Sequence, residues 1–250
     1  TLWHTLSLHD ALPIWEHLAE ANATKDKFFS IISHDLRNPF NHLLGFSELL
    51  IDRFDTLEDE RKREFLDNIH SSLHHMFRLL ENLLSWSRFQ LGTIEWHPAS
   101  VNLRDIIKEA MALLESQATG KQIQLQSRLN ESLHVYADPN MLETVLRNLL
   151  SNAIKFTHEG GNVWIEVERA SEMILVSIHD TGIGIPEDKL DTLFNIDIQY
   201  SRPGTQEERG TGLGLILCRE FVEKNGGQIW VERGQTSGSV FVFSLPAHHS

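Results

Sequence analysis

The chain has 250 residues, of which 41% are hydrophobic, and its formal net charge at pH 7 is −13. This length has room for about two domains of ~100–150 residues each. The acidic balance argues against nonspecific binding to DNA or to anionic membranes, because both require a basic surface. No apolar run approaches the ~18–20 residues needed to cross a bilayer. A single cysteine, Cys218, excludes a disulfide framework and a cysteine-based metal site.

Residues 1–14 do not fit the pattern of the rest of the chain. They have no sustained heptad, and Pro13 would break a helix entering the segment behind it. The run TLSLHDALPI, which ends at Ile14, also equals one reading frame of a common sequencing-library adapter. We therefore interpret residues 1–14 as an adapter-derived segment outside the natural protein, and we expect the natural protein to continue upstream.

Residues 15–91 are predicted to form a helical hairpin. Apolar residues at three-to-four-residue spacing run from about Trp15 to Leu50, and a second such stripe runs from Phe65 to Trp86. A polar and acidic turn, residues 57–60, separates the two stripes. Two amphipathic helices joined by a short loop make an antiparallel hairpin, and two hairpins make a four-helix bundle. The pattern therefore predicts a homodimer.

The first helix carries a candidate nucleophile. His34 and Asn38 are four residues apart and share a face, while Asp35 stands beside the histidine and can accept its ring proton. A neutral imidazole with one nitrogen held by a carboxylate presents the other nitrogen as a nucleophile. Pro39 predicts a helix kink just after His34. A surface histidine in an ordinary amphipathic helix is the simpler interpretation of a lone His–Asp pair, so the downstream motifs must decide.

Residues 92–97 are predicted to be a hinge that follows a C-cap at Gly92, and residues 98–248 a second domain. The hydrophobic patterns of this domain predict helices that alternate with two-residue-period strands. The predicted helices begin near Leu103 and cover 139–156 and 212–225, and the predicted strands cover 122–126, 133–137, 162–168, 173–179, 228–232 and 239–245. Largely segregated helices and sheet describe an α+β protein whose second domain is an α/β sandwich.

Within the predicted helix 139–156, Asn148 and Asn152 are four residues apart and Lys155 is three further on, so all three share a face. Asparagine costs helix stability and rarely repeats in this way without a polar ligand. An amide carbonyl can bind Mg²⁺ while leaving its charge available to phosphate oxygens, and a lysine can meet those oxygens directly. The spacing therefore points to a phosphate site.

Two glycine-containing stretches follow. Asp180 stands at the end of a predicted strand, where its carboxylate can accept a hydrogen bond from the amino group of adenine. Gly182 and Gly184 follow it and would let the backbone turn and approach the adenine ring closely. After an aperiodic stretch, residues 195–209, a helix opens with exposed amides that attract phosphate. That opening consists of Gly210, Thr211, Gly212, Leu213 and Gly214. A Walker-type P-loop is excluded, because its Gly-x-x-x-x-Gly-Lys-Ser/Thr pattern is absent from the sequence.

These motifs together resemble those of bacterial two-component sensor histidine kinases. FFSIISHDLRNP resembles the family's H box, and LRNLLSNAIKFT its N box; DTGIG and GTGLG resemble the G1 and G2 boxes. The likeness extends through nearly all of residues 22–246. It implies a dimeric helical bundle followed by an ATP-binding domain of the gyrase, Hsp90, histidine kinase and MutL type. Phe194 stands where the family has its F box, which lacks here the usual second phenylalanine.

The resemblance also implies roles for residues. Asn152 would hold Mg²⁺, Asn148 and Lys155 would place the phosphates, Asp180 would read adenine, and the glycines at 210–214 would close an ATP lid anchored by Phe194. His34 would be phosphorylated from ATP with help from Asp35, and the phosphoryl group would pass to an aspartate of a response-regulator receiver domain. Asn38 resembles a phosphatase position of the family. This part of the chain would be cytoplasmic, and upstream sequence would decide whether the full-length protein is anchored in a membrane.

Two other functions fit parts of the pattern. The first is an ATPase-driven clamp of the gyrase or Hsp90 kind, which has no phosphoacceptor helix and is disfavoured by the His34 motif with its proline. The second is a dimeric pseudokinase scaffold, which is disfavoured because every motif residue that a kinase needs is present. The sequence does not determine the stimulus, the cognate regulator, or whether phosphorylation occurs within or between subunits.

Overall fold

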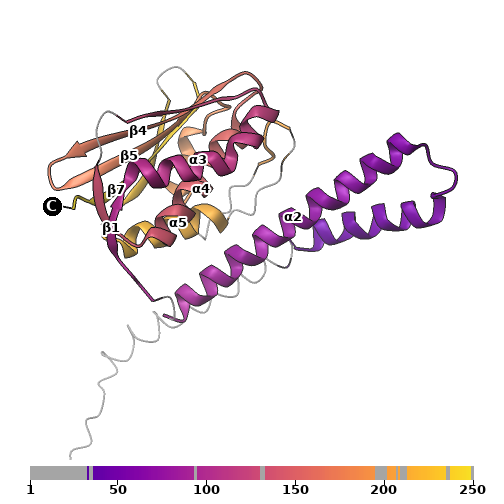
Figure 1. The fold of residues 1–250 in the computed structure, drawn as a ribbon, viewed down its shortest axis with the longest axis horizontal. Helices are drawn as coiled ribbons and strands as arrows, with labels where there is room; N and C mark the ends of the chain where they lie inside the picture. The colour runs from indigo at the N-terminus through magenta and orange to yellow at the C-terminus, as the bar shows by residue number, and fades with distance from the viewer. Residues whose placement is uncertain are drawn as a thin grey trace, which may run out of the picture. The chain divides into compact units, whose positions relative to one another are not determined.

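A computed structural model describes residue 33 and residues 36–92, 95–129, 133–194, 202–206, 208, 213–234 and 237–248. The chain divides into two compact units between Leu84 and Ser85. Both units are drawn in Figure 1. Several sequence predictions fall outside the described residues: the adapter segment 1–14, the predicted first helix from Trp15 up to residue 32, the His34–Asp35 pair, and Gly210, Thr211 and Gly212.

The first unit is the predicted antiparallel helical hairpin. Residues 36–53 are helical, and after a short turn α2 runs over Asp59–Gln90, of which the part from Ser85 on falls in the second unit. Two acidic residues in the first turn of α2 complement the helix dipole. Near the turn, the Lys62 ammonium lies 4.8 Å from the centre of the Phe54 ring. Further along, the rings of Phe46 and Phe65 lie 5.4 Å apart. These contacts join the two helices along their facing sides.

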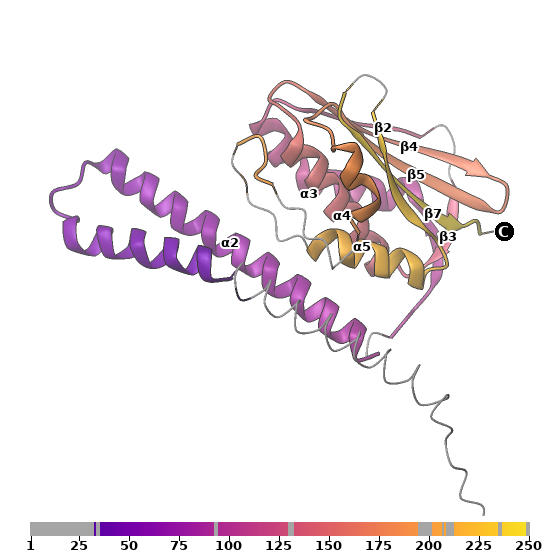
Figure 2. The ribbon, with the colours of Figure 1, turned by 180° about the vertical axis from the view of Figure 1, so that it is seen from behind.

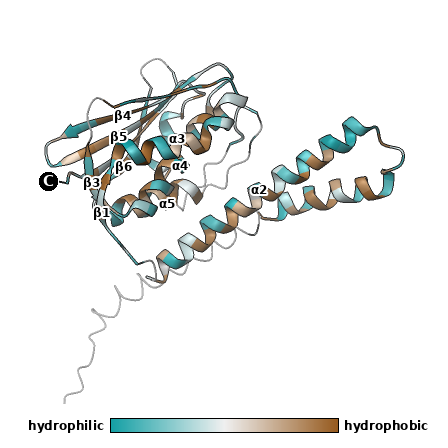
Figure 3. Cartoon of the chain, in the orientation of Figure 1, coloured by the Kyte–Doolittle hydropathy of each residue, from teal (hydrophilic) through white to brown (hydrophobic). Residues whose placement is uncertain are grey.

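The hairpin leaves many large apolar side chains exposed. The hydropathy colouring of Figure 3 shows hydrophobic segments, in brown, recurring along α2. Five of them recur on α2 at spacings of seven, four, three and four residues, which is one helix face. These five are Leu66, Leu73, Phe77, Leu80 and Leu84. A contiguous apolar stripe of this kind on an isolated chain marks a surface that another protein covers.

The second unit has two layers. Its main sheet has five strands in the order β2-β4-β5-β7-β6, in which only the β2–β4 pair is parallel, and β1 and β3 form a separate antiparallel pair. The strands are β1 (Ala99–Asn102), β2 (Gln124–Arg128), β3 (His134–Ala137), β4 (Asn162–Ala170), β5 (Met173–Asp180), β6 (Ile229–Arg233) and β7 (Ser239–Pro246). The helices are α3 (Leu103–Gly120), α4 (Pro139–Phe156), a 3-10 helix η1 (Glu187–Thr192) and α5 (Leu213–Lys224).

Helices α3, α4 and α5 cover one face of the main sheet, as Figures 1 and 2 show from opposite sides. Strand β5 alternates strictly, and the side chains that point to the helices are Ile174, Val176 and Ile178. Asp180 is the next member of this buried set. The period of the strand therefore carries a carboxylate to the edge of the apolar core.

Among the described residues, the predicted elements are confirmed with small shifts at their ends. Helix α4 has the predicted bounds, and the strands differ by at most two residues at either end. Gly92 has φ +64, the left-handed conformation expected of a C-cap glycine. Strand β1 was not predicted, because residues 99–102 lack a strand pattern and become a strand only by pairing with β3.

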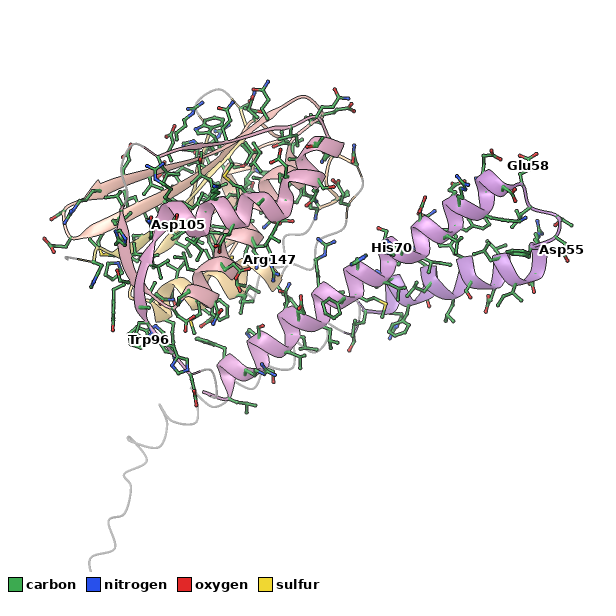
Figure 4. All side chains as sticks on the ribbon, in the orientation of Figure 1. Asp55, Glu58, His70, Trp96, Asp105 and Arg147 are labelled. Atoms are coloured by element: carbon green, nitrogen blue, oxygen red, sulfur yellow. The ribbon has the colours of Figure 1, made fainter. Side chains whose placement is uncertain are left out.

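A buried asparagine attaches the start of the second unit to its helices. The side-chain oxygen of Asn225 accepts from Trp96 Nε1 at 3.1 Å and from the backbone N–H of Asp138 at 2.7 Å. Asp138 in turn accepts from the backbone N–H of His97 at 2.9 Å. Trp96 is labelled in Figure 4, just before β1. One side chain thus connects the chain entering β1, the start of α4 and the end of α5.

We predict that Asn225→Ala lowers the free energy of unfolding by about 1–3 kcal/mol, because the buried N–H of Asp138 loses its acceptor. The indole N–H of Trp96 loses the same acceptor, so Trp96 fluorescence should change as well. Urea unfolding with both circular dichroism and fluorescence detection tests this. The exposed Asn140 on α4 provides the matched control, Asn140→Ala. An Asn225→Ala protein as stable as the control would contradict the prediction.

Candidate nucleotide-binding site

Helix α4 supports the site. Asp138 caps its N-terminus by accepting from the backbone N–H groups of Asn140 at 2.9 Å and Met141 at 3.2 Å, and Pro139 occupies its first turn. The apolar side of α4 is packed in the core. Its buried hydrophobic residues are Met141, Leu142, Val145, Leu146, Leu149, Leu150, Ala153 and Ile154. Packing on this scale fixes the rotation of the helix about its axis, and so which of its residues face away from the core.

Asn148 and Asn152 lie half-buried on α4, one turn apart. The amide nitrogen of Asn148 donates to the carbonyl oxygen of Thr144 at 2.9 Å. Its amide oxygen faces α5, because a Cβ on Gly214 would lie only 2.7 Å from Asn148 Oδ1. A side chain at position 214 would therefore displace Asn148. The structure thus brings the last glycine of the second glycine motif against the first asparagine of the α4 motif.

Asp180 is buried, with 4% of its surface exposed, in a setting that only glycines permit. Its Oδ1 accepts from the backbone N–H of Gly182 at 2.8 Å. A Cβ on Gly182 would lie 2.2 Å from the carbonyl oxygen of Phe156, at the end of α4. Gly238 has φ +77, and a Cβ added to it would lie only 1.9 Å from the carbonyl oxygen of Asp180. These close approaches place the Asp180 carboxylate beside the C-terminal end of α4.

Burial raises the pKa of Asp180 to about 6. Hydrogen bonds from Gly182 and Ser239 and the charge of Arg202 act in the opposite direction, but they do not outweigh burial. The carboxylate is therefore largely ionised at neutral pH, although its surroundings resist the charge. An ionised carboxylate is a pure acceptor and suits a ligand that presents N–H donors, such as the amino group of adenine. Keeping such a group buried is typical of a binding site.

Lys155, in the last turn of α4, is 8% exposed. Its ammonium lies 4.6 Å from the centre of the Phe156 ring. The Arg202 guanidinium lies 5.5 Å from the same ring and donates to the carbonyl oxygen of Gly184. Two cations thus flank one aromatic ring beside the Asp180 loop. Positive charge is therefore concentrated at this end of α4.

The described residues gather most of the predicted nucleotide motifs around α4. The helix itself carries Asn148 and Lys155, and its residues are approached closely by Gly182 and Gly214. The carbonyl oxygen of Gly184 accepts a hydrogen bond from Arg202. Phe194 packs edge-on against Phe241 of the core, with ring centres 6.4 Å apart. Asn38, which is half-buried on the helix 36–53, belongs to the other unit.

Sequence reasoning missed several residues at the edge of the site, because they lie in no motif. These residues are Lys121, Arg202, Thr205, Glu208 and Gly238. The aperiodic stretch before the second glycine motif gave a weak signal for three of them. Lys121 and Gly238 contact residues that are distant in the sequence, so no local pattern indicates these contacts.

Comparison with known families assigns both halves of the chain. Residues 24–92 match the family described as "His Kinase A (phospho-acceptor) domain". Residues 137–249 match the family described as "Histidine kinase-, DNA gyrase B-, and HSP90-like ATPase". The second unit therefore contains an ATPase domain of that family, which supports the use of ATP.

Related proteins agree with this assignment. An uncharacterised sensor-like histidine kinase of Rhizobium meliloti is 35% identical over 94% of this chain and 45% of its own length. The adaptive-response sensory kinase SasA of a Synechococcus species is 33% identical over 90% of this chain and 60% of its own length. The chain thus spans about half the length of these relatives.

Solved structures are also similar. The catalytic domain of the histidine kinase ThkA is 33% identical over 60% of this chain and 95% of that domain, with a TM-score of 0.54. ThkA in complex with the response regulator protein TrrA is 26% identical over 92% of this chain and 64% of ThkA, with a TM-score of 0.69. The chain belongs to the two-component sensor histidine kinase family.

Among the described residues, no helix is both long enough and apolar enough to span a membrane. In the same part of the chain, no three or more His, Cys, Asp or Glu side chains are grouped as ligands for a metal ion.

We predict that Asp180→Asn makes the nucleotide-free protein more stable at pH 7.5, by up to about 3 kcal/mol, while removing its affinity for adenosine. The folded-state pKa is raised, so the folded protein binds the proton more tightly than the unfolded chain does. Stability due to Asp180 is therefore lost as pH rises from near 4 through about 6. The advantage of the variant should shrink below pH 6, which urea unfolding at several pH values measures. A difference independent of pH would contradict the prediction.

Proposed function

We propose that this chain is an ATP-dependent protein-histidine kinase that phosphorylates its own His34. The observation that carries the proposal is the buried, glycine-enclosed Asp180 beside the polar face of α4, in a chain whose other half matches a phosphoacceptor family. Asp180 would accept from the adenine amino group. Asn148 and Lys155 would contact the phosphates, and the glycines at 210–214 would close over them.

The proposed transfer is a displacement at the γ-phosphorus. A ring nitrogen of His34 forms the new P–N bond while the bond to the β,γ-bridging oxygen breaks, and ADP leaves with that electron pair. Asp35 orients the imidazole and accepts the proton of the other ring nitrogen, so the phosphorylated ring is neutral. Electrostatic positioning by Lys155 offsets the charge of the transferring group.

Mg²⁺ is the cofactor that we assign to this site. Asn152 would hold it, because an amide oxygen binds the ion without neutralising it, and the ion would offset phosphate charge during the transfer. The chain offers no cluster of carboxylates among its described residues for this purpose. The nucleotide itself would then complete the coordination.

We further propose that the phosphoryl group passes to an aspartate of a response-regulator receiver domain. The similar kinase ThkA has been solved in complex with the response regulator protein TrrA. Asn38, one turn from His34 in the sequence, would orient a water for dephosphorylation of the regulator. The clamp alternative has no use for the phosphoacceptor match at residues 24–92. The scaffold alternative has no use for the complete set of kinase motif residues.

The domain boundaries form part of the same proposal. Residues 15–91 would dimerise and carry the phosphoacceptor, residues 92–97 would act as the hinge, and residues 98–248 would bind ATP. Residues 1–14 would be foreign to the natural protein. We place this part of the chain in the cytoplasm, where ATP is available.

The decisive test is incubation with γ-labelled ATP and Mg²⁺, comparing the intact protein with His34→Gln and Asn152→Ala. The intact protein should acquire an acid-labile, base-stable label, as expected of a phosphoramidate. Both variants should lose at least 95% of this label, His34→Gln while still binding ATP. His134→Gln, a change at a half-buried position of β3, serves as the matched histidine control, and its labelling should be unchanged. If His34→Gln is labelled like the intact protein, the proposal is wrong.

The exposed stripe on α2 supports a homodimer and gives a second test. Leu73 and Phe77 are 52% and 58% exposed, and a dimer would bury both. We predict that the double change Leu73→Glu and Phe77→Glu converts the dimer to a monomer, because it would bury four carboxylates per dimer. Light scattering after gel filtration measures this. Ser71→Glu, on another side of α2, is the control and should remain dimeric.

A further inference from the structure

Lys121 is a buried lysine whose hydrogen bonds no motif of the sequence predicts. Lys121 follows α3 as its C-terminal cap and is 4% exposed. Its ammonium donates to four oxygens: those of the Ile154 and Lys155 carbonyls at 3.1 and 3.0 Å, Thr205 Oγ1 at 2.6 Å and Glu208 Oε1 at 2.9 Å. An ammonium has three protons, so the four acceptors saturate it.

Two of these acceptors belong to the C-terminal turn of α4. Carbonyl groups in the last turn of a helix lack partners within the helix and form the negative end of its dipole. The ammonium of Lys121 therefore satisfies the Ile154 and Lys155 carbonyls where a buried unpaired carbonyl would be costly. The contact also joins α3 to α4 at the residue whose side chain we assign to the phosphates.

The other two acceptors come from the stretch formed by residues 202–206 and Glu208, which we call the anchored segment. Thr205 donates its backbone N–H to the Lys155 carbonyl at 3.1 Å and its hydroxyl to the Thr157 carbonyl at 2.8 Å. The second carboxylate oxygen of Glu208 accepts from the backbone N–H of Gln206 at 2.7 Å. The Glu208 carboxylate thus accepts one hydrogen bond from within the anchored segment and one from Lys121.

The anchored segment also covers the Lys155 side chain. A Cβ on Gly204 would lie 2.7 Å from Cγ of Lys155, so the glycine backbone packs directly on the lysine stem. At its other end, Arg202 donates to the carbonyl oxygen of Gly184, in the loop that follows Asp180. The segment therefore touches both the adenine side and the phosphate side of the proposed site.

Charge supports the importance of the Lys121–Glu208 pair. Burial alone would raise the pKa of Glu208, but hydrogen bonds from Lys121 and from backbone N–H groups outweigh it and the pKa is lowered. Glu208 is therefore ionised at neutral pH and paired with a buried cation. Removing either partner leaves the other without its counter-charge.

We propose that Lys121 is a positioning residue for the phosphates of ATP: it fastens the anchored segment over the end of α4 and so holds Lys155 in place before nucleotide binds. This inference rests on the proposed ATP site. A site arranged in advance loses less conformational entropy on binding. Adenosine, which has no phosphates, should be bound through Asp180 and not depend on Lys121.

The test compares Lys121→Met with Lys108→Met, a matched change at an exposed position of α3. We expect Lys121→Met to weaken Mg·ATP binding at least tenfold and adenosine binding less than twofold, measured by calorimetry and by NMR titration respectively. Lys108→Met should bind both ligands like the intact protein. Equal losses for ATP and adenosine, or no loss for ATP, would overturn the inference.

Two milder variants protect the test against misfolding. Thr205→Val and Glu208→Gln alter the anchored segment, whose side chains are only partly buried, and leave Lys121 in place. Both should weaken the binding of Mg·ATP more than the binding of adenosine, and both should unfold closer to the temperature of the intact protein than Lys121→Met does. Equal effects on the two ligands would contradict the inference. If the intact protein itself binds no Mg·ATP, the proposed function fails. If it binds Mg·ATP and all three variants bind it equally well, only the role of Lys121 fails.

Discussion

The packing of α4 against the sheet is the constraint on which the rest of the second unit depends. One side of this helix supplies eight buried hydrophobic residues to the core, from Met141 to Ile154. The buried side sets the rotation of the helix about its axis, and this rotation also places Asn148, Asn152 and Lys155. The core therefore fixes the polar face, and a change that loosens the core must also displace the proposed phosphate ligands. Stability and the proposed nucleotide binding are thus coupled through a single element.

Strand β5 imposes the complementary constraint. Its alternation brings Ile174, Val176 and Ile178 into the core and then delivers a carboxylate to the same face. Asp180 is buried because of its register, and the raised pKa is the consequence. A protein selected for stability alone would not keep a carboxylate there. The nearby glycines, which bring backbone within contact distance of Asp180 and of Phe156, indicate that the arrangement serves a ligand.

Periodicity and local motifs were sufficient to predict the helical hairpin, the bounds of α4 and the placement of Asp180 at the end of a strand. They could not reveal contacts that depend on tertiary packing. Lys121 and Glu208 are 87 residues apart and meet only because α3, α4 and the anchored segment converge. Strand β1 was missed for the same reason, since its partner β3 lies beyond α3. Asn225 likewise gives no local signal of the three segments that it joins.

The most direct test of the account is a crystal structure of the protein with Mg²⁺ and a non-hydrolysable ATP analogue. We expect the adenine amino group within hydrogen-bond distance of Asp180, the metal ion on the amide oxygen of Asn152, and the phosphates beside Asn148 and Lys155. A nucleotide bound elsewhere, or bound with its adenine away from Asp180, would contradict the account of how the sheet edge and α4 together form the site.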